Sequence, residues 1–435
     1  MSSERASAVR SIVRVASGNF LEMYDFQIFG YYAAAIGATF FPKGSEYASL
    51  MASLATFGAG FLMRPLGAIF LGAYIDRHGR RAGLLLTLGL MAVGTLSIAC
   101  TPSYAAIGLL APLLVLAGRL VQGLSAGVEI GGVSVYLSEI ATRGHKGFYV
   151  SWQSASQQVG VIFASLLGLI VTAYLSTDEM TRWGWRIPML VGCLIIPVLF
   201  LLRRSLEETE EFLARSRRPR AKEIFGSLAS NWKLVFAAIM LVTLNTVYYY
   251  MITAYTPTFG STVLHLPGSK SMIATLCVGA SNLFWIPVMG ALSDRLGRRP
   301  ILLAVAVITL LTAYPALSWL TNAPSFSRLI EIELWFSFLY GSYSGALIVF
   351  LTEIMPLDFR TAGFSLAYSG AAAVFGGFTP AASTFLIHTT GNNAAPAIWL
   401  SFAAIFSLAA ALILSQERVA GITVDSNAMR LSAIK

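Results

Sequence analysis

Twelve apolar runs, each long enough to cross a lipid bilayer, recur along the 435 residues of this chain. A helix needs about 20 mostly apolar residues to span the hydrocarbon core. Because lipid cannot satisfy backbone groups, such segments fold as helices. We therefore predict an all-α membrane protein with twelve transmembrane helices. The predicted spans lie near residues 16–41, 48–74, 82–101, 106–138, 148–175, 186–203, 233–258, 271–292, 299–320, 328–354, 361–388 and 396–415.

The composition agrees with lipid as the solvent. Hydrophobic residues make up 56% of the chain and charged residues 12%, whereas a soluble domain is about a quarter charged. The net charge of +9 comes from short loops between apolar runs, so membrane orientation explains it and no nucleic-acid partner is expected. The three cysteines lie inside apolar segments without metal-like spacing. We expect no metal and no other cofactor.

The loops also predict the orientation of the chain. With both termini in the cytoplasm, 23 lysines and arginines face inward and 5 face outward, which follows the positive-inside rule. The longest polar interval precedes the seventh run and is typical of a cytoplasmic linker. We expect it to be partly helical and to lie on the membrane surface. We predict a first six-helix half at 1–204, a linker at 205–232 and a second half at 233–435.

An internal repeat supports two equivalent halves. Residues 72–81 (GAYIDRHGRR) recur as residues 290–299 (GALSDRLGRR), 218 positions later. A second pair, around Glu139 and Glu353, is 214 positions apart. Both pairs fall at the predicted inner ends of matching helices. Repeated halves of this kind can rock against each other around a central site.

The repeated motif predicts a latch between the halves. Its glycines allow helices to approach closely, and its aspartates can accept from a helix N-terminus and pair with arginines. A simple positive anchor would need the arginines but neither the aspartates nor the glycines. The predicted latch residues are Gly72, Asp76, Arg77, Gly79, Arg80, Arg81, Glu139, Gly290, Asp294, Arg295, Gly297, Arg298, Arg299 and Glu353.

With twelve helices, the doubled motif resembles the major facilitator superfamily. Residues 119–123 (RLVQG) are similar to its second motif. Residues 17–26 (SGNFLEMYDF), 64–67 (RPLG) and 183–188 (WGWRIP) resemble the metabolite–proton symporter branch. Further stretches are similar to bacterial citrate–proton symporters and their tricarballylate relatives; they are residues 131–139 (GGVSVYLSE) and 152–158 (WQSASQQ).

The resemblance implies a secondary transporter in the bacterial inner membrane. Its expected activity is proton-coupled uptake of citrate, or of a close tricarboxylate such as tricarballylate, by alternating access in a functional monomer. The expected partners are a small organic anion, protons and membrane lipid. A citrate trianion moving inward costs about 7 kcal/mol at an inside-negative 100 mV, at roughly 2.3 kcal/mol per charge. An importer must therefore bring positive charge with its substrate.

Three carboxylates inside the predicted spans are candidates for proton coupling. An ionisable side chain at bilayer depth costs about 2.5–3.5 kcal/mol on insertion scales, so each one needs a reason. Glu22 and Asp25 share one face of the first helix, and two buried carboxylates so close favour keeping a proton. Pairing of either with an arginine remains an alternative. Glu129 is equally consistent with a proton-relay role and with a structural pair to another helix.

Two arginines at membrane depth, Arg64 and Arg119, are candidates for binding a substrate anion. A guanidinium offers two parallel donors to a carboxylate. Structural pairing with Glu22, Asp25 or Glu129 is the competing interpretation, and substrate could displace a carboxylate in turn. Polar residues that could complete the site are Asn19, Gln122, Gln153, Gln157, Tyr340 and Tyr343.

Other functions fit the sequence less well. A dicarboxylate carrier, or a carrier of a zwitterion such as betaine or proline, would use the same fold, although two buried arginines argue against a zwitterion. A non-transporting membrane sensor would be supported by a long soluble output domain, which the sequence lacks. We do not expect an enzyme, because the four histidines lie near no plausible nucleophile or metal cluster. Export and sodium coupling stay open.

Overall fold

The computed structural model describes residue 20 and residues 22–41, 44–78, 80–127, 129–204, 221–356 and 359–432. At some helical positions, among them 75–77, 80–81, 129 and 415–432, only the backbone is described. The described residues form helices joined by short connections, and no strand occurs among them. The predicted all-α architecture is therefore present.

The helices of the first half follow residues 22–31, which are helical themselves. They are α2 (Ala33–Phe40), α3 (Glu46–Leu62), α4 (Arg64–His78), α5 (Arg80–Cys100), α6 (Tyr104–Ile107), α7 (Leu110–Ser125), α8 (Glu129–Glu139), α9 (Lys146–Tyr174), α10 (Thr177–Glu179), the π-helix η1 (Met180–Gly184) and α11 (Arg186–Arg204). The fourth predicted run is thus broken between α7 and α8.

The second half begins after a helix within the predicted linker, α13 (Ala221–Ser230). Its elements are α14 (Trp232–Tyr250), the π-helix η2 (Met251–Tyr255), α15 (Thr256–Thr262), α16 (Gly268–Leu296), α17 (Arg298–Asn322), α18 (Phe326–Ile354), α19 (Arg360–Ala371), the π-helix η4 (Ala372–Gly376), α20 (Thr379–Thr390) and α21 (Pro396–Ser432).

Local sequence marks several of these boundaries. Ser45 and Ser325 precede α3 and α18, and each hydroxyl accepts a hydrogen bond from the backbone three residues on, which satisfies an otherwise unpaired amide. Gly297 ends α16 with φ of +86°, a conformation that side chains with a Cβ disfavour. The repeated motif therefore turns the chain sharply from α16 into α17.

Nine helical stretches of the described part are long and apolar enough to cross a membrane. Leu85–Cys100 is a shorter apolar helix. The stretches Trp232–Thr262 and Phe326–Ile354 are each 83% buried over their most apolar window, whereas Arg298–Asn322 is 39% buried. The first two therefore run through the interior, and α17 lies at the periphery, where its apolar surface suits lipid.

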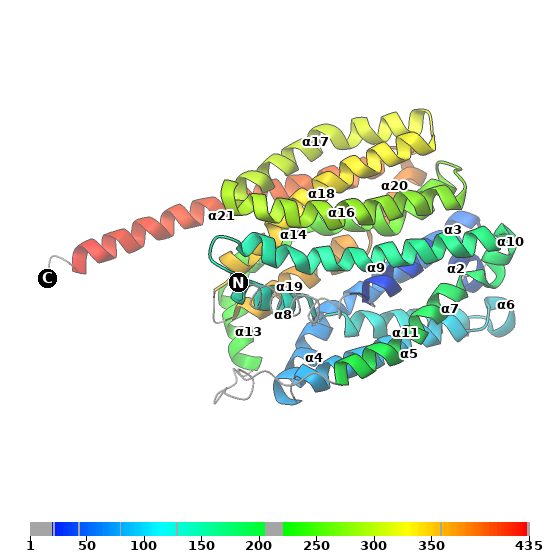
Figure 1. Cartoon of the computed structure of the whole chain (residues 1–435), viewed down its shortest axis with the longest axis horizontal. Coiled ribbons are helices and arrows are strands. Elements are labelled where there is room, and N and C mark those ends of the chain that lie inside the picture. Colours follow the sequence, from blue (N-terminus) through cyan, green and yellow to red (C-terminus); the bar gives the residue numbers. More distant parts are fainter. Residues whose placement is uncertain are drawn as a thin grey trace, which may run out of the picture.

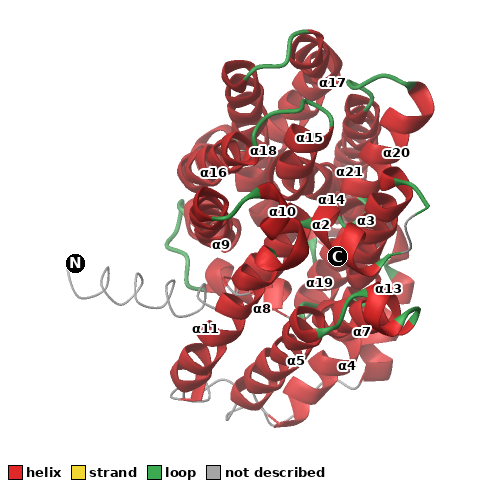
Figure 2. Cartoon of the chain, turned by 90° about the vertical axis from the view of Figure 1, so that its right-hand side faces the viewer, coloured by secondary structure: helices red, strands yellow, loops and turns green. Residues whose placement is uncertain are grey.

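The two halves lie side by side along the bundle. In Figure 1, α16, α17, α18 and α21 form one group, and α4, α5, α7 and α11 form the other, with α9 running along α16. Figure 2 views the helices nearly end-on and shows the same two groups. Further contacts between the halves join α19 to α4 and α8, and α3 to η4 and α20. These contacts enclose the central region from both ends.

Close helix packing in the first half depends on glycine. A Cβ placed on Gly123 of α7 would lie 1.7 Å from the carbonyl oxygen of Gly60 on α3, so α3 and α7 touch through their backbones. Gly132, in the same predicted run, has nothing within 4 Å of such a Cβ. The two glycines therefore provide a matched comparison.

We expect Gly123→Ala to lower the free energy of unfolding by about 1–3 kcal/mol, because α3 and α7 must separate to admit the methyl group. Gly132→Ala should leave it nearly unchanged. Thermal unfolding of the purified protein in detergent measures both. Equal melting temperatures for the two variants would contradict the packing argument.

Candidate functional site

A buried ion pair connects the first helix to α4. The Nη2 atom of Arg64 lies 2.6 Å from Oε1 of Glu22, and the two side chains are 1% and 3% exposed. The guanidinium also lies 4.8 Å from the ring centre of Phe26 and 4.6 Å from that of Phe61. Nε and Nη1 of Arg64 have no hydrogen-bond partner among the described residues. The arginine therefore keeps donors that an anion could use.

The second arginine lies beside the first. Arg119 on α7 donates from Nη1 to Oε1 of Gln122 at 2.7 Å and from Nη2 to the carbonyl of Phe57 at 3.4 Å. Its guanidinium lies 4.6 Å from the ring centre of Phe26, so both arginines share this ring. Two guanidinium groups thus lie close together in a low-dielectric interior, where the charges on them interact strongly with neighbouring groups.

A chain of hydrogen bonds links Arg119 to the other carboxylate of the first helix. Nε2 of Gln122 donates to Oγ1 of Thr95 at 2.9 Å, and Oγ1 of Thr95 lies 2.6 Å from Oδ2 of Asp25. Asp25 is 4% exposed. The first helix, α5 and α7 thus meet in one polar network.

The two carboxylates take different partners. Glu22 pairs with Arg64, which is the alternative that the sequence left open for it, and Asp25 bonds to Thr95. Their spacing on one helix face placed both in the interior. It did not reveal that the two groups belong to separate networks, because the partners come from distant helices.

The other predicted site residues that the structure describes come from α9 and α18. Gln153 and Gln157 are buried on α9, and their Nε2 atoms have no hydrogen-bond partner among the described residues. Tyr340 is buried on α18, with its ring centre 5.8 Å from that of Tyr249 on α14. Tyr343 donates instead to the carbonyl of Leu241 at 2.9 Å.

Tyr343 also contacts Ser407 on α21. Its hydroxyl therefore joins three helices of the second half, and the structure does not bring it to the arginines. Asn19 lies outside the described residues, and the side chain of Glu129 is likewise not described. Their predicted roles stay predictions.

Sequence reasoning missed the amides that bridge the halves. Nε2 of Gln27 on the first helix lies 3.1 Å from the hydroxyl of Tyr249 and 3.2 Å from Oγ1 of Thr253 on η2. Asn282 on α16 donates to Oε1 of Gln158 on α9 at 3.2 Å. A polar neutral residue inside an apolar run was the available signal. The sequence alone could not tell which ones cross the interface.

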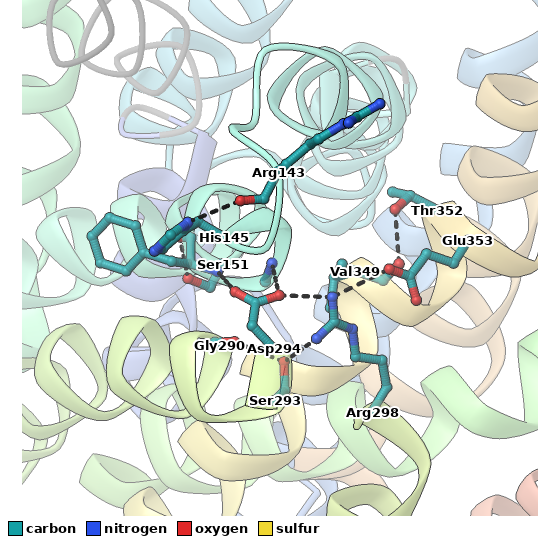
Figure 3. Close-up of polar contacts among 12 residues, drawn as sticks. Arg143, His145, Ser151, Gly290, Ser293, Asp294, Arg298, Val349, Thr352 and Glu353 are labelled. Carbon is teal, nitrogen blue, oxygen red and sulfur yellow. Dashed lines mark hydrogen bonds and ion pairs between the residues drawn. The ribbon is translucent and has the colours of Figure 1, made fainter. Parts of the chain in front are cut away.

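One end of the interface is closed by the second copy of the repeated motif. Oδ1 of Asp294 accepts from the backbone amide of Gly147 at 2.8 Å, and Oδ2 accepts from that of Phe148 at 3.2 Å. These amides begin α9, where a carboxylate is favoured. Arg298 lies 2.7 Å from Asp294 and 3.2 Å from Glu353. Figure 3 shows this cluster between the halves.

Gly290 allows the backbones to meet at this cluster. A Cβ on Gly290 would lie 2.6 Å from the carbonyl oxygen of Gly147 and 2.7 Å from the Cβ of Ser151. The close approach expected at this glycine is therefore present. Whether the contact opens and closes stays a prediction.

The remaining latch residues divide into two groups. Arg295 is exposed, and Arg299 donates to the carbonyl of Ala411 at 3.1 Å. Glu139 is exposed and makes no ion pair with Arg143 or with any other residue the structure describes, and its role in the latch stays a prediction. Gly79 lies outside the described residues. Only the backbone is described for the other predicted residues of this loop: Gly72, Asp76, Arg77, Arg80 and Arg81.

The fold and the buried charges define a multi-pass membrane transporter. Residues 11–416 match the family described as sugar (and other) transporter, and the chain belongs to this family. It is similar in fold to the crystal structure of a D-xylose-proton symporter, with a TM-score of 0.72 and 18% identity over 91% of this chain and 96% of that one. The predicted twelve-helix fold of two repeated halves is thereby confirmed.

Two curated relatives are much closer in sequence. The chain is 56% identical over 410 residues to the citrate-proton symporter of Salmonella typhi, covering 94% of each. It is 57% identical over 410 residues to the citrate-proton symporter of Klebsiella pneumoniae, covering 94% of this chain and 92% of the relative. The resemblance drawn from the motifs is thereby confirmed.

We expect Asp294→Asn to weaken the closed end, because charge-assisted hydrogen bonds contribute about 1.5–3 kcal/mol each. Ser151 is buried beside Gly290, so a cysteine placed there reports opening to a hydrophilic maleimide after the three native cysteines are replaced. Labelling of Ser151→Cys should accelerate by at least about tenfold in the Asp294→Asn background.

The exposed ion pair of Asp178 with Arg182 supplies the control. Asp178→Asn should leave the labelling rate unchanged, since surface pairs contribute little. Equal rates in the Asp294 and Asp178 variants would contradict a closing role for Asp294.

Proposed function

We propose that this protein imports citrate, or a closely related tricarboxylate such as tricarballylate, together with protons across the bacterial inner membrane. The observation that carries the proposal is the pair of buried arginines around Phe26, each next to a network that contains a carboxylate. The names of the two citrate-proton symporters reported above support the same substrate.

The donors around the arginines suit a substrate with several carboxylates. Arg64 and Arg119 keep guanidinium donors without described partners, and each can hold a carboxylate. The amides of Gln153 and Gln157 and the hydroxyl of Tyr340 are buried groups that could bind the remaining oxygens. A zwitterion would bring a cation next to two buried guanidinium groups, and repulsion between like charges in a low-dielectric interior disfavours it.

The hydroxyl of Thr95 supports Asp25 as a proton site. This oxygen lies 2.9 Å from the carbonyl of Met91, 2.6 Å from Asp25 and 2.9 Å from the amide nitrogen of Gln122. A hydroxyl has one proton to donate and two lone pairs. All three contacts are hydrogen bonds when Asp25 is protonated, because Thr95 then accepts from Gln122 and Asp25 and donates to Met91. An ionised Asp25 would compete with Met91 for the single proton.

Glu22 supplies the link between substrate and the arginines. Its pairing with Arg64 compensates the buried cation when no substrate is bound. A substrate carboxylate that takes the place of Glu22 on Arg64 would leave Glu22 to accept a proton. Substrate and proton would then enter together, and each proton offsets about 2.3 kcal/mol of the electrical cost at 100 mV.

The remaining parts of the proposal concern the whole chain. We place both termini in the cytoplasm, with halves at 1–204 and 233–435 joined by a linker at 205–232, in a functional monomer. Asp294 then closes the cytoplasmic end of the interface. Aromatic contacts such as that of Tyr47 with His388, at 3.7 Å between ring centres, lie at the opposite end. In this conformation the halves touch at both ends, as alternating access requires of an occluded state.

Uptake of radiolabelled citrate into proteoliposomes, driven by an inside-alkaline pH gradient, tests the function. Unlabelled citrate and tricarballylate should compete. Uptake that does not depend on the pH gradient, or that is blocked by betaine or proline instead, would overturn the proposal.

We expect Arg119→Gln to weaken the apparent affinity for citrate by about 10–100-fold, because a hydrogen bond to a charged group contributes about 1.5–3 kcal/mol. Arg182→Gln is the matched control, since Arg182 is 75% exposed and pairs only with Asp178 among described residues. Concentration dependence of uptake measures both variants. Unchanged affinity in Arg119→Gln would remove Arg119 from the substrate site.

A further inference from the structure

One buried carboxyl group lies outside the network of the two arginines. Glu333 on α18 is 7% exposed. Its Oε1 accepts from the hydroxyl of Thr256 at 2.6 Å, and its Oε2 has no hydrogen-bond partner among the described residues. The structure shows no ion pair of Glu333 with any residue it describes.

Glu333 borders a small cavity inside the second half. The cavity has a volume of about 20 Å³, which is enough for about one water molecule. Side chains from η2, α15, α17, α18 and the start of α21 line it, and no lysine, arginine or histidine is among them. Tyr255 is the other titratable group in the lining, and its hydroxyl accepts from Thr384 at 3.1 Å.

The charged neighbours on α18 itself point elsewhere. Glu331 is exposed. Arg328 donates to the carbonyl of Trp319 at 2.7 Å and stacks on the ring of that tryptophan. A carboxylate without a cation in an apolar interior is costly. A protonated, neutral Glu333 would avoid this cost while its Oε1 still accepts from Thr256.

The π-helix η2 connects this acid to the interface between the halves. Thr256, which directly follows η2, bonds to Glu333. Thr253 within η2 accepts from Gln27 of the first half. A Cβ on Gly30 of the first helix would lie 3.0 Å from the Cβ of Ala254. Such π-helical turns often mark functional sites. Here the turn contacts the first half on one side and the Glu333 cavity on the other.

We propose that Glu333 binds a proton whose presence favours closure of the end of the interface opposite Asp294. When η2 moves away from the first helix, water reaches the cavity and Glu333 ionises. When η2 returns, Glu333 must take a proton back from the solution on that side. The closed form thus holds one proton more than the open form, so falling pH favours closure. This inference rests on the proposed alternating-access cycle.

A distance measurement between labels at exposed positions Glu46 on α3 and Thr389 on α20 tests the inference. The contact of Tyr47 with His388 joins these two helices. With the three native cysteines replaced, pulsed electron paramagnetic resonance reports the populations of the closed and open forms. We expect the closed-to-open ratio to rise by up to about tenfold per pH unit as pH falls.

Glu333→Gln removes the titration while keeping the shape and neutrality of the protonated acid. We expect this variant to stay closed at every pH. Glu331 is an exposed neighbour on the same helix. In Glu331→Gln and in His388→Asn, the closed-to-open ratio should depend on pH as it does in the wild type. A wild-type slope in Glu333→Gln, a slope lost in His388→Asn, or no slope in the wild type would overturn the inference.

Citrate exchange across the membrane of proteoliposomes separates this inference from the proposed function. Binding and exchange measured on the same preparations also show that each variant is folded. A wild-type protein that exchanges no citrate but shows the Glu333-dependent slope would overturn the substrate and keep the proton site. If the wild type exchanges citrate but Glu333→Gln leaves the pH dependence of the closed-to-open ratio unchanged, the substrate stands and the proton site is overturned.

Discussion

Two arginine side chains buried next to Phe26 impose the constraint on which the rest of this structure depends. A guanidinium at membrane depth needs compensation, and the first helix places one carboxyl group next to each arginine network, Glu22 beside Arg64 and Asp25 beside Thr95. Glu22 compensates Arg64 directly. Asp25 reaches Arg119 through Thr95 and Gln122. The first half is therefore held together by a buried ion pair and a polar network, and our proposal is that an anionic substrate and protons replace these charges.

The contacts between the halves are of a different kind. Gln27 with Tyr249 and Asn282 with Gln158 are hydrogen bonds between neutral groups, each with a net contribution of about 0.5–1.5 kcal/mol. Contacts this weak can be exchanged without unfolding either half. The charged contact of Asp294 is stronger but lies at one end, where water can replace it. Strong interactions within a half and weak ones between halves are what a rocking motion requires.

Periodicity and composition were enough to predict most of the fold, because lipid leaves few alternatives to a helix. The repeated motif likewise placed Asp294 near a helix N-terminus, since glycine, aspartate and arginine at that spacing have few other uses. Partners between helices were harder to predict. That Glu22 pairs with Arg64 while Asp25 does not depends on how helices rotate against one another. Glu333 was not predicted, because a glutamate near the start of its apolar run (residues 328–354) can equally lie at the membrane surface, and only the packing of the helices shows that it is buried.

The two halves thus carry different buried charged and polar groups, although part of their sequence repeats. The first half carries both buried arginines, and its two buried carboxyl groups contact Arg64 and Thr95. The second half carries Asp294 at one end and Glu333 toward the other, and each bonds next to an element that contacts the first half. Repetition provides two bodies of matching shape. The differences between them are the basis for our proposal that substrate binds in the first half and that the second half controls the two exits.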